Sequence, residues 1–225
     1  MLEAAPGVRS VLLVLVLLAP AARADDDGTR AYFPLHVGNW WAYEEEGDDG
    51  KTLAREMWSV LAATPEEASD EFHLRSSTKR LDGLARAGGH RWNGDEYLRR
   101  TDAGLVKRYP AGRDGTTLVL LLKDPLRAGT RWHDSQGNCA ITARGPCVGP
   151  HGDLPDCAVV VCRLGDPTAT VVTSTYARDV GMVRQEIEVV QFVPSLHGSG
   201  AVFPSATTQG GHSLLRLTAF HVGGR

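Results

Sequence analysis

The chain has 225 residues, a net charge of −3 at pH 7, a hydrophobic content of 42% and five tryptophans. This composition is enough for one packed domain or two small halves, and it excludes a disordered chain. Charges of both signs are mixed along a mildly acidic sequence. That balance argues against a general nucleic-acid-binding protein, which would carry a basic face.

Residues 1–24 have the pattern of a secretory signal peptide. An apolar run is followed by Ala22 and Ala24, whose small-x-small spacing predicts cleavage after Ala24. The alternative, a retained membrane anchor, is disfavoured because the run is shorter than the ~20 residues that span a bilayer, and no later stretch is long enough. We therefore expect a periplasmic or extracellular protein with a flexible acidic N-terminus over 25–31 and a β-rich domain over 32–223.

The rest of the chain alternates short apolar or β-branched segments with turn residues, which is typical of antiparallel β-sheet. The expected strands are NWWAYEEE, KTLAREMWSVLA, EFHLRSSTKR, GLVKRYP, TTLVLLLK, CAITA, CAVVVCRL, TATVVTSTYA, GMVRQEIEVVQFV and SLLRLTAFHV. KTLAREMWSVLA also has helical spacing, but its place after the turn GDDG favours a strand. The predicted fold class is mainly β: a single domain of antiparallel meander, with a curved sheet or half-barrel and little helix beyond the signal peptide.

Two segments predict connections between strands. Asn93-Gly94, within HRWNGDEYLRR, is a strong signal for a tight hairpin. Residues 194–212 are rich in Gly, Ser, Thr and Pro and predict a long loop. This loop is either a solvated connection or a lid over a binding face.

The first expected strand divides its aromatic residues between two faces. Period-two alternation places Trp41 and Tyr43 on one face, and Trp40 with Glu44 and Glu46 on the other. We expect Trp41 and Tyr43 in the core. Trp40 is the candidate contact for a ligand or a partner.

The pattern P-L-x-x-G-x-x-W occurs twice, at 34–41 and 125–132. As a strand entry, the Pro fixes the approach, the Gly permits a turn and the Trp points to the core. Trp132 is therefore a third expected core aromatic residue. The repeat indicates either duplicated halves or convergent use of one local turn, and the poor match of the halves elsewhere favours convergence.

Four cysteines lie close together: Cys139, Cys147, Cys157 and Cys162. On one strand, Cys157 and Cys162 would be about 16 Å apart and on opposite faces, whereas a disulfide needs Cα atoms within about 7 Å. The nested pairing, Cys139–Cys162 outside Cys147–Cys157, suits an antiparallel hairpin and is favoured over the crossed pairing. Free buried thiols are a further alternative. The spacings lack the C-x2-C pairs of zinc sites and the C-x-x-C of redox proteins.

No catalytic motif is found in the chain. None of the eight histidines forms an H-x-x-x-H or H-E-x-x-H pattern, and there is no G-x-S-x-G elbow, P-loop or dinucleotide fingerprint. The carboxylate pairs Glu44/Glu46 and Glu186/Glu188 each share a strand face, which is typical of a solvated surface. We expect no catalytic residue, no metal site and no cofactor.

The order of four local motifs resembles a group of uncharacterised exported bacterial β-domain proteins. The first three are YFPL-x-VGN-x-W-x-Y at 32–43, PL-x-x-G-x-x-W at 125–132 and a Gly- and Cys-containing segment at 149–161, which departs from the group's Val-Pro-Ala start. The fourth, YA-x-x-VG-x-V, is matched at 176–183. The resemblance implies a β-sheet domain of unknown function, similar in style to the curved sheets of periplasmic lipoprotein carriers.

Three hypotheses for function follow. The favoured one is a non-enzymatic protein that binds an apolar ligand or an envelope protein on one sheet face. The first alternative is an envelope structural or interaction protein with a filled core, and the second is a hydrolase with a cryptic site. A lined cavity inside the sheet would favour the first hypothesis, and a cleft with clustered histidines and carboxylates would favour the third.

Overall fold

The structure is a computed structural model that describes residues 28–66, 69–81, 91–110, 116–134, 137–165, 169–194 and 206–223. Within these ranges it contains one short helix, α1 (Thr29–Tyr32), and twelve strands. The strands are β1 (Trp40–Gly47), β2 (Thr52–Glu66), β3 (Ser69–Arg80), β4 (Arg91–Thr101), β5 (Gly104–Pro110), β6 (Thr116–Lys123), β7 (Arg131–His133), β8 (Gly137–Gly149), β9 (Gly152–Leu164), β10 (Ala169–Ala177), β11 (Gly181–Pro194) and β12 (Ala206–His221).

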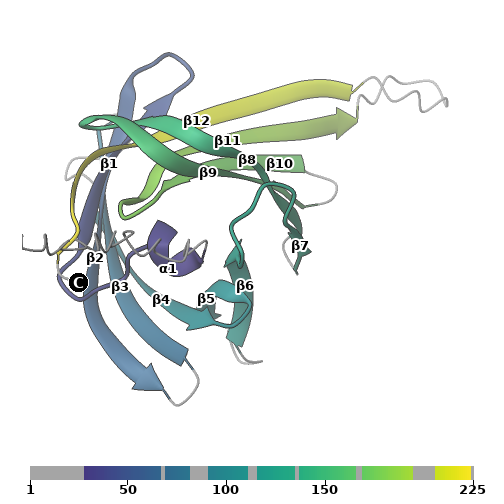
Figure 1. Cartoon of the computed structure of the whole chain (residues 1–225). Coiled ribbons are helices and arrows are strands. Elements are labelled where there is room, and N and C mark those ends of the chain that lie inside the picture. The colour runs from purple at the N-terminus through teal and green to yellow at the C-terminus, as the bar shows by residue number, and fades with distance from the viewer. Residues whose placement is uncertain are drawn as a thin grey trace, which may run out of the picture.

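The twelve strands form one antiparallel sheet in the order β6-β5-β4-β3-β2-β1-β12-β11-β10-β9-β8-β7. It consists of two six-stranded meanders, β1–β6 and β7–β12, which meet where β1 pairs with β12. The sheet curls until β6 comes close to β7, which gives a nearly closed, barrel-like shape (Figure 1). The predicted fold class, a single mainly β domain with a curved antiparallel sheet, is confirmed.

Side chains join the two edge strands of the sheet, β6 and β7. The indole Nε1 of Trp132 donates a hydrogen bond to the carbonyl of Leu120 at 2.9 Å, and the Asp134 carboxylate accepts one from the Leu120 amide at 3.2 Å. Lys123 Nζ also donates to the Arg131 carbonyl at 3.1 Å. Because an exposed edge strand is a template for unwanted pairing, this closure also protects both edges.

The two P-L-x-x-G-x-x-W segments have the same backbone structure, each at the start of one meander. The Gly38 amide donates to the Val60 carbonyl of β2 at 3.0 Å, and the Gly129 amide donates to the Ile141 carbonyl of β8 at 2.8 Å, in both cases on the second strand of the meander. The φ angles are 92° at Gly38 and 91° at Gly129. The two segments have the same backbone geometry at equivalent positions of the two meanders. This favours duplicated halves over convergent use of one local turn, which the sequence alone favours.

The core lies inside the curve of the sheet, where α1 occupies part of the space (Figure 1). Tyr32, at the end of α1, is fully buried. The guanidinium groups of Arg144 and Arg178 lie 5.0 and 5.1 Å from the centre of its ring, and the Asp156 carboxylate accepts a 2.7 Å hydrogen bond from each arginine. These half-buried charges are therefore paired, and they hold α1 against the sheet.

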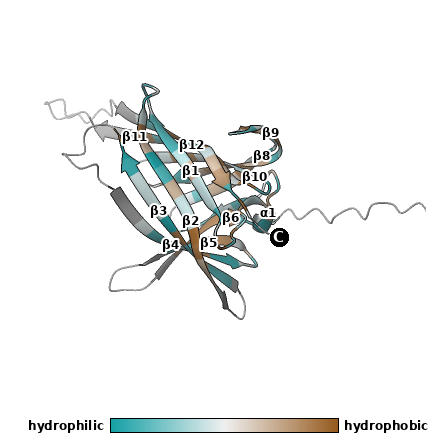
Figure 2. Ribbon diagram, turned by 90° about the vertical axis from the view of Figure 1, so that its left-hand side faces the viewer, coloured by the Kyte–Doolittle hydropathy of each residue, from teal (hydrophilic) through white to brown (hydrophobic). Residues whose placement is uncertain are grey.

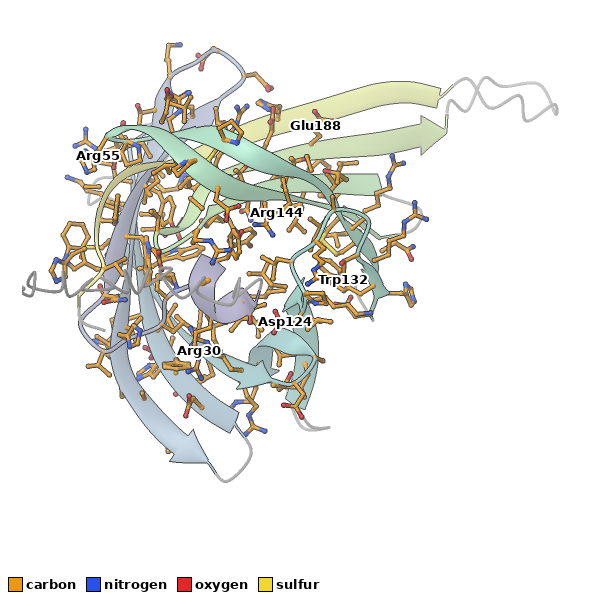
Figure 3. All side chains as sticks on the ribbon, viewed as in Figure 1. Arg30, Arg55, Asp124, Trp132, Arg144 and Glu188 are labelled. Carbon is orange, nitrogen blue, oxygen red and sulfur yellow. A yellow bond between two sulfur atoms is a disulfide. The ribbon has the colours of Figure 1, made fainter. Side chains whose placement is uncertain are left out.

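The other end of α1 is held by Asp124. One carboxylate oxygen accepts a 2.6 Å hydrogen bond from the Thr29 amide. In Figure 3, Asp124 and Arg144 point toward α1 from different parts of the sheet, whereas Arg55 and Glu188 lie on its outside. Hydrophilic and hydrophobic residues alternate along the strands (Figure 2), as expected where one face is buried and the other solvated.

Three local predictions differ from the structure. Part of the expected flexible segment 25–31 belongs to α1, because Asp124 and the core anchor it. The hairpin expected at Asn93-Gly94 is absent: β4 runs straight through, with Asn93 opposite Ser77, because the ladder with β3 overrides the local turn preference. The expected loop 194–212 is also too long.

The correction to that loop concerns its second half. β12 begins at Ala206, and residues 206–212 pair with β11, including Gly210 opposite Val190. Cross-strand pairing thus extends through Gly210 and Gly211, although glycine disfavours strands. Residues 195–205 of the predicted loop lie outside the described residues.

The two strand entries give a matched test of the fold. Gly38 and Gly129 have positive φ angles and no neighbouring atom within 4 Å of an added Cβ. We expect Gly38→Ala and Gly129→Ala each to lower the free energy of unfolding by about 1–2 kcal/mol through backbone strain alone. Urea unfolding measures this. Gly211→Ala is the control, because Gly211 has equal space without a positive φ, and a similar loss there would contradict the account.

The Asp156 network predicts a specific dependence on pH. Burial raises the pKa of Asp156, but hydrogen bonds from Arg178 and Arg144 outweigh burial and hold the pKa below its ordinary value. A lowered folded-state pKa adds stability above the unfolded pKa of about 3.9, and this stability is lost as the pH falls through the folded value. We expect Asp156→Asn to cost about 1–3 kcal/mol at pH 7 and to make stability less sensitive to acid.

Urea midpoints measured from pH 7 to pH 2.5 test this expectation. The control is Asp153→Asn, which removes an exposed carboxylate from the same strand. Parallel pH profiles for wild type and Asp156→Asn would show that the network does not contribute as described.

Candidate ligand-binding cavity

A cavity of about 200 Å³, partly open to solvent, lies between β6 and the inner faces of β8 to β11. Most of its wall is aliphatic, formed by Val119, Leu121, Val160, Leu164, Val172 and Ile187. An apolar cavity of about 150 Å³ stays dry and binds benzene. The cavity therefore has room for one small ring or a short alkyl chain.

The alternation of β10 produces one side of the cavity. Val172, Ser174 and Tyr176 are two residues apart and so share the inner face of the strand. Cross-strand pairing places Val172 between Cys162 of β9 and Ile187 of β11. Two residues further along β10, Ser174 lies between Val160 of β9 and Gln185 of β11.

Burial increases along this face, which gives the cavity a deep end and a mouth. Ser174 is 5% exposed and Tyr176 is 8% exposed, so they lie at the deep end. Val172, Ile187 and Leu164 are half-buried and lie toward the mouth. A ligand that enters would pass the aliphatic layer before it reaches Ser174.

The deep end is polar and uncharged. Gln185 Nε2 donates a hydrogen bond to the Ser174 hydroxyl oxygen at 3.1 Å. Burial raises the pKa of Tyr176 to about 12, so that its hydroxyl stays protonated at neutral pH. Three neutral groups, two hydroxyls and one amide, therefore border an otherwise apolar space.

A carboxylate marks the mouth. Asp134 is half-buried, and it is the one charged residue among the lining residues that the structure describes. Its carboxylate accepts hydrogen bonds from the backbone amides of Leu120 at 3.2 Å and of Gly137 at 3.3 Å. Asp134 thus belongs to both the β6–β7 edge contact and the cavity.

One disulfide forms part of the cavity wall. The structure joins Cys139 to Cys162 and Cys147 to Cys157, with Cα atoms 4.0 and 6.0 Å apart, which is the nested arrangement. Both bonds link β8 to β9. Cys139 and Cys162 line the cavity, whereas the second bond lies near the turn between the strands.

The expected core aromatic residues lie in the core but outside the cavity lining. Trp41 and Tyr43 are 0% and 1% exposed and donate hydrogen bonds to the carbonyls of Val180 and Met182 at 2.6 and 3.1 Å. Trp132 is also buried and helps to join β6 to β7. All three stabilise the sheet around the cavity.

Trp40, the candidate contact residue, is placed away from the cavity. It is half-buried, and its ring stacks on His221 with a centroid distance of 6.5 Å. Of the residues that line the cavity, Cys139 and Cys162 were singled out from the sequence, but only as a disulfide pair. The only signal was that Ser174 and Tyr176 follow Val172 on one face of an apolar strand.

The six histidines among the described residues are absent from the cavity lining. His73 lies 3.0 Å from Asp95, and His212 lies 2.9 Å from Glu186. Strand alternation places both pairs on the outer face, since their neighbours Leu74 and Gln185 point inward. In the described ranges, no cluster of three or more His, Cys, Asp or Glu side chains is arranged to hold a metal ion.

Comparisons with known proteins give the fold. The chain matches no protein-family model, and no curated protein matches it significantly. A solved structure of a "putative lipoprotein" from Parabacteroides distasonis is similar, with a TM-score of 0.50 and 14% identity. A "putative exported protein with YmcC-like fold" from Bacteroides fragilis has a TM-score of 0.51 and 13% identity. Each match covers 84% of this chain and 98% of the other.

At these identities the likeness is one of fold alone. It nevertheless covers the whole length of both neighbours apart from a few residues, so the arrangement of two meanders in one curved sheet is shared with solved structures. No helix in the described part of the chain has the length and hydropathy needed to cross a membrane.

The two disulfides should stabilise opposite ends of the β8–β9 hairpin. We expect replacement of either pair by serines to lower the free energy of unfolding by about 2–4 kcal/mol. Hydrogen exchange should locate the effects: loss of Cys139–Cys162 should speed exchange at the cavity end, in β7 and early β8. Loss of Cys147–Cys157 should speed hydrogen exchange only near the Gly149–Gly152 turn. The same exchange pattern in both variants would contradict this division.

Proposed function

We propose that the protein is exported and binds a small apolar ligand in the cavity, without catalysing a reaction. The observation that carries this proposal is an aliphatic-walled space of about 200 Å³ on the inner side of the sheet, beside the packed core. Ligand sites in proteins are typically concave and mostly apolar, with a few polar groups that orient the ligand. The cavity has both features.

Export is supported by three independent features. Two disulfides are typical of proteins from oxidising compartments. Residues 1–24 have the pattern of a cleaved signal peptide. Both solved structures of similar fold carry names that refer to export or to a lipoprotein. We infer a periplasmic or extracellular location, as in the exported bacterial group that the motif order resembles.

The alternative of an interaction protein with a filled core fits only part of the molecule. The buried Phe72, Leu98 and Leu105 pack on the inner face of the first meander. The cavity lies between β6 and the inner faces of β8 to β11. An unfilled apolar space costs dispersion contacts and stability, so a binding role accounts for its presence better than a structural role does.

A cryptic hydrolase is disfavoured by the partners of the buried serine. A nucleophilic serine needs a base within hydrogen-bond reach, most often histidine. The partners of Ser174 are Gln185 and Tyr176, and neither is a base of that kind, because an amide does not take the proton and burial raises the pKa of Tyr176. The histidine–carboxylate pairs among the described residues lie on the outer face of the sheet.

Filling the cavity tests the proposal. Benzene at about ten times its dissociation constant should stabilise the wild type by about 1.4 kcal/mol, because it binds only the folded state. Val172→Trp should abolish this stabilisation, since the side chain would occupy the space. Val171→Trp is the matched control, because the neighbouring position points to the other face of β10 and should leave the benzene effect intact.

Thermal unfolding with and without benzene gives the readout. The proposal is wrong if benzene does not stabilise the wild type, or if it stabilises Val172→Trp equally well. Native mass spectrometry of protein purified from its own compartment can then identify the ligand that it carries.

A further inference from the structure

We propose that the cavity selects neutral amphiphiles: an alkyl chain or ring with one uncharged hydrogen-bonding group, such as a hydroxyl, that binds at Ser174, Tyr176 and Gln185. This inference rests on the proposed function and specifies its ligand class. It is carried by the positions of the polar side chains and by the absence of positive charge among the described lining residues.

The deep end can both donate and accept hydrogen bonds. The Ser174 oxygen accepts from Gln185 Nε2, and Ser174 is also hydrogen-bonded to Tyr176, which leaves the Gln185 amide oxygen as an acceptor for a ligand. The Tyr176 hydroxyl adds a group that can do either. A ligand hydroxyl can therefore be satisfied by neighbours of both kinds.

A purely apolar ligand would use this end poorly. Polar groups that are removed from water without a partner cost about 1–3 kcal/mol each. Only 5% of the Ser174 surface is exposed. A ligand that covers Ser174 removes the remaining access of its hydroxyl to water and must offer a hydrogen bond in its place. An alcohol does so, and an alkane of the same length does not.

Anionic ligands are disfavoured by the charges around the cavity. Among the described lining residues there is no lysine, arginine or histidine, and the one charged side chain is the carboxylate of Asp134 at the mouth. An anion would lose its hydration without a counter-charge and would approach a like charge. A fatty acid in its ionised form should therefore bind more weakly than the alcohol of equal length.

A cationic head group meets its one counter-charge among the described lining residues, Asp134, at the mouth and not at the deep end. The Asp134 carboxylate is fixed there by hydrogen bonds from the backbone amides of Leu120 and Gly137. An ammonium group at the deep end would meet neutral partners only. A neutral head group is compatible with both the neutral partners at the deep end and the carboxylate of Asp134 at the mouth.

Calorimetric titration with benzene, 1-hexanol, hexanoate and hexylamine at pH 7.5 tests the inference. We expect 1-hexanol to bind at least tenfold more tightly than hexanoate and more tightly than hexylamine.

Tyr176→Phe and Ser174→Ala should each lower the affinity for 1-hexanol relative to benzene by three- to tenfold. The ratio keeps the test valid if a variant also loosens the cavity. Asp134→Asn, whose amide oxygen can still accept a hydrogen bond, should narrow the gap between 1-hexanol and hexanoate.

The two possible failures are distinguishable. If neither benzene nor 1-hexanol binds the wild type, the proposed function itself is wrong. If benzene binds but hexanoate or hexylamine matches 1-hexanol, or if both polar variants leave the hexanol-to-benzene ratio unchanged, the selectivity is wrong while the apolar binding site stands.

Discussion

The contact between β6 and β7 determines the shape of the interior. In the described sheet these two strands are the edges, and the side chains of Trp132 and Asp134 join them through the backbone of Leu120. Once the edges meet, the inner faces of both meanders surround one common space. The cavity lies directly beside this contact and shares Leu120 and Asp134 with it.

The curved sheet encloses both a helix and a cavity. α1 lies inside the curve and is held by Asp124 at one end and by the Asp156–arginine network at the other. Asp124 follows β6 of the first meander, whereas Arg144, Asp156 and Arg178 belong to the second, so α1 connects the two meanders. Pairing makes these charges tolerable at half-buried positions. The cavity lies in another part of the interior, between β6 and β8 to β11.

The repeated strand entry has a different role in each half of the sheet. The paired strand entries place Trp41 and Trp132 at the second position of β1 and β7. Trp41 binds a carbonyl within the second meander, whereas Trp132 binds one on the opposite edge strand and so closes the sheet. A duplicated meander in which one copy became the site of closure accounts for both positions.

Sequence patterns predicted the elements whose signals are local. Alternation located most strands and the buried face of Trp41 and Tyr43, and strand spacing was enough to argue for the nested cysteine pairing. Asn93-Gly94 shows the limit of such signals, because pairing with β3 overrode its turn preference. The cavity depends on which strands face each other across the closed sheet. Val172, Ser174 and Tyr176 have no property, read along the chain, that distinguishes them from any half-buried strand.

The central claim is that an apolar space stands open between β6 and the inner faces of β8 to β11. A crystal structure of the protein under xenon pressure tests it most directly, because xenon enters dry apolar cavities. We predict xenon density bounded by the Cys139–Cys162 disulfide, Val172 and Ile187, and no such density in Val172→Trp. A wild-type crystal without xenon at this place, with side chains of the surrounding strands packed there instead, would contradict the account.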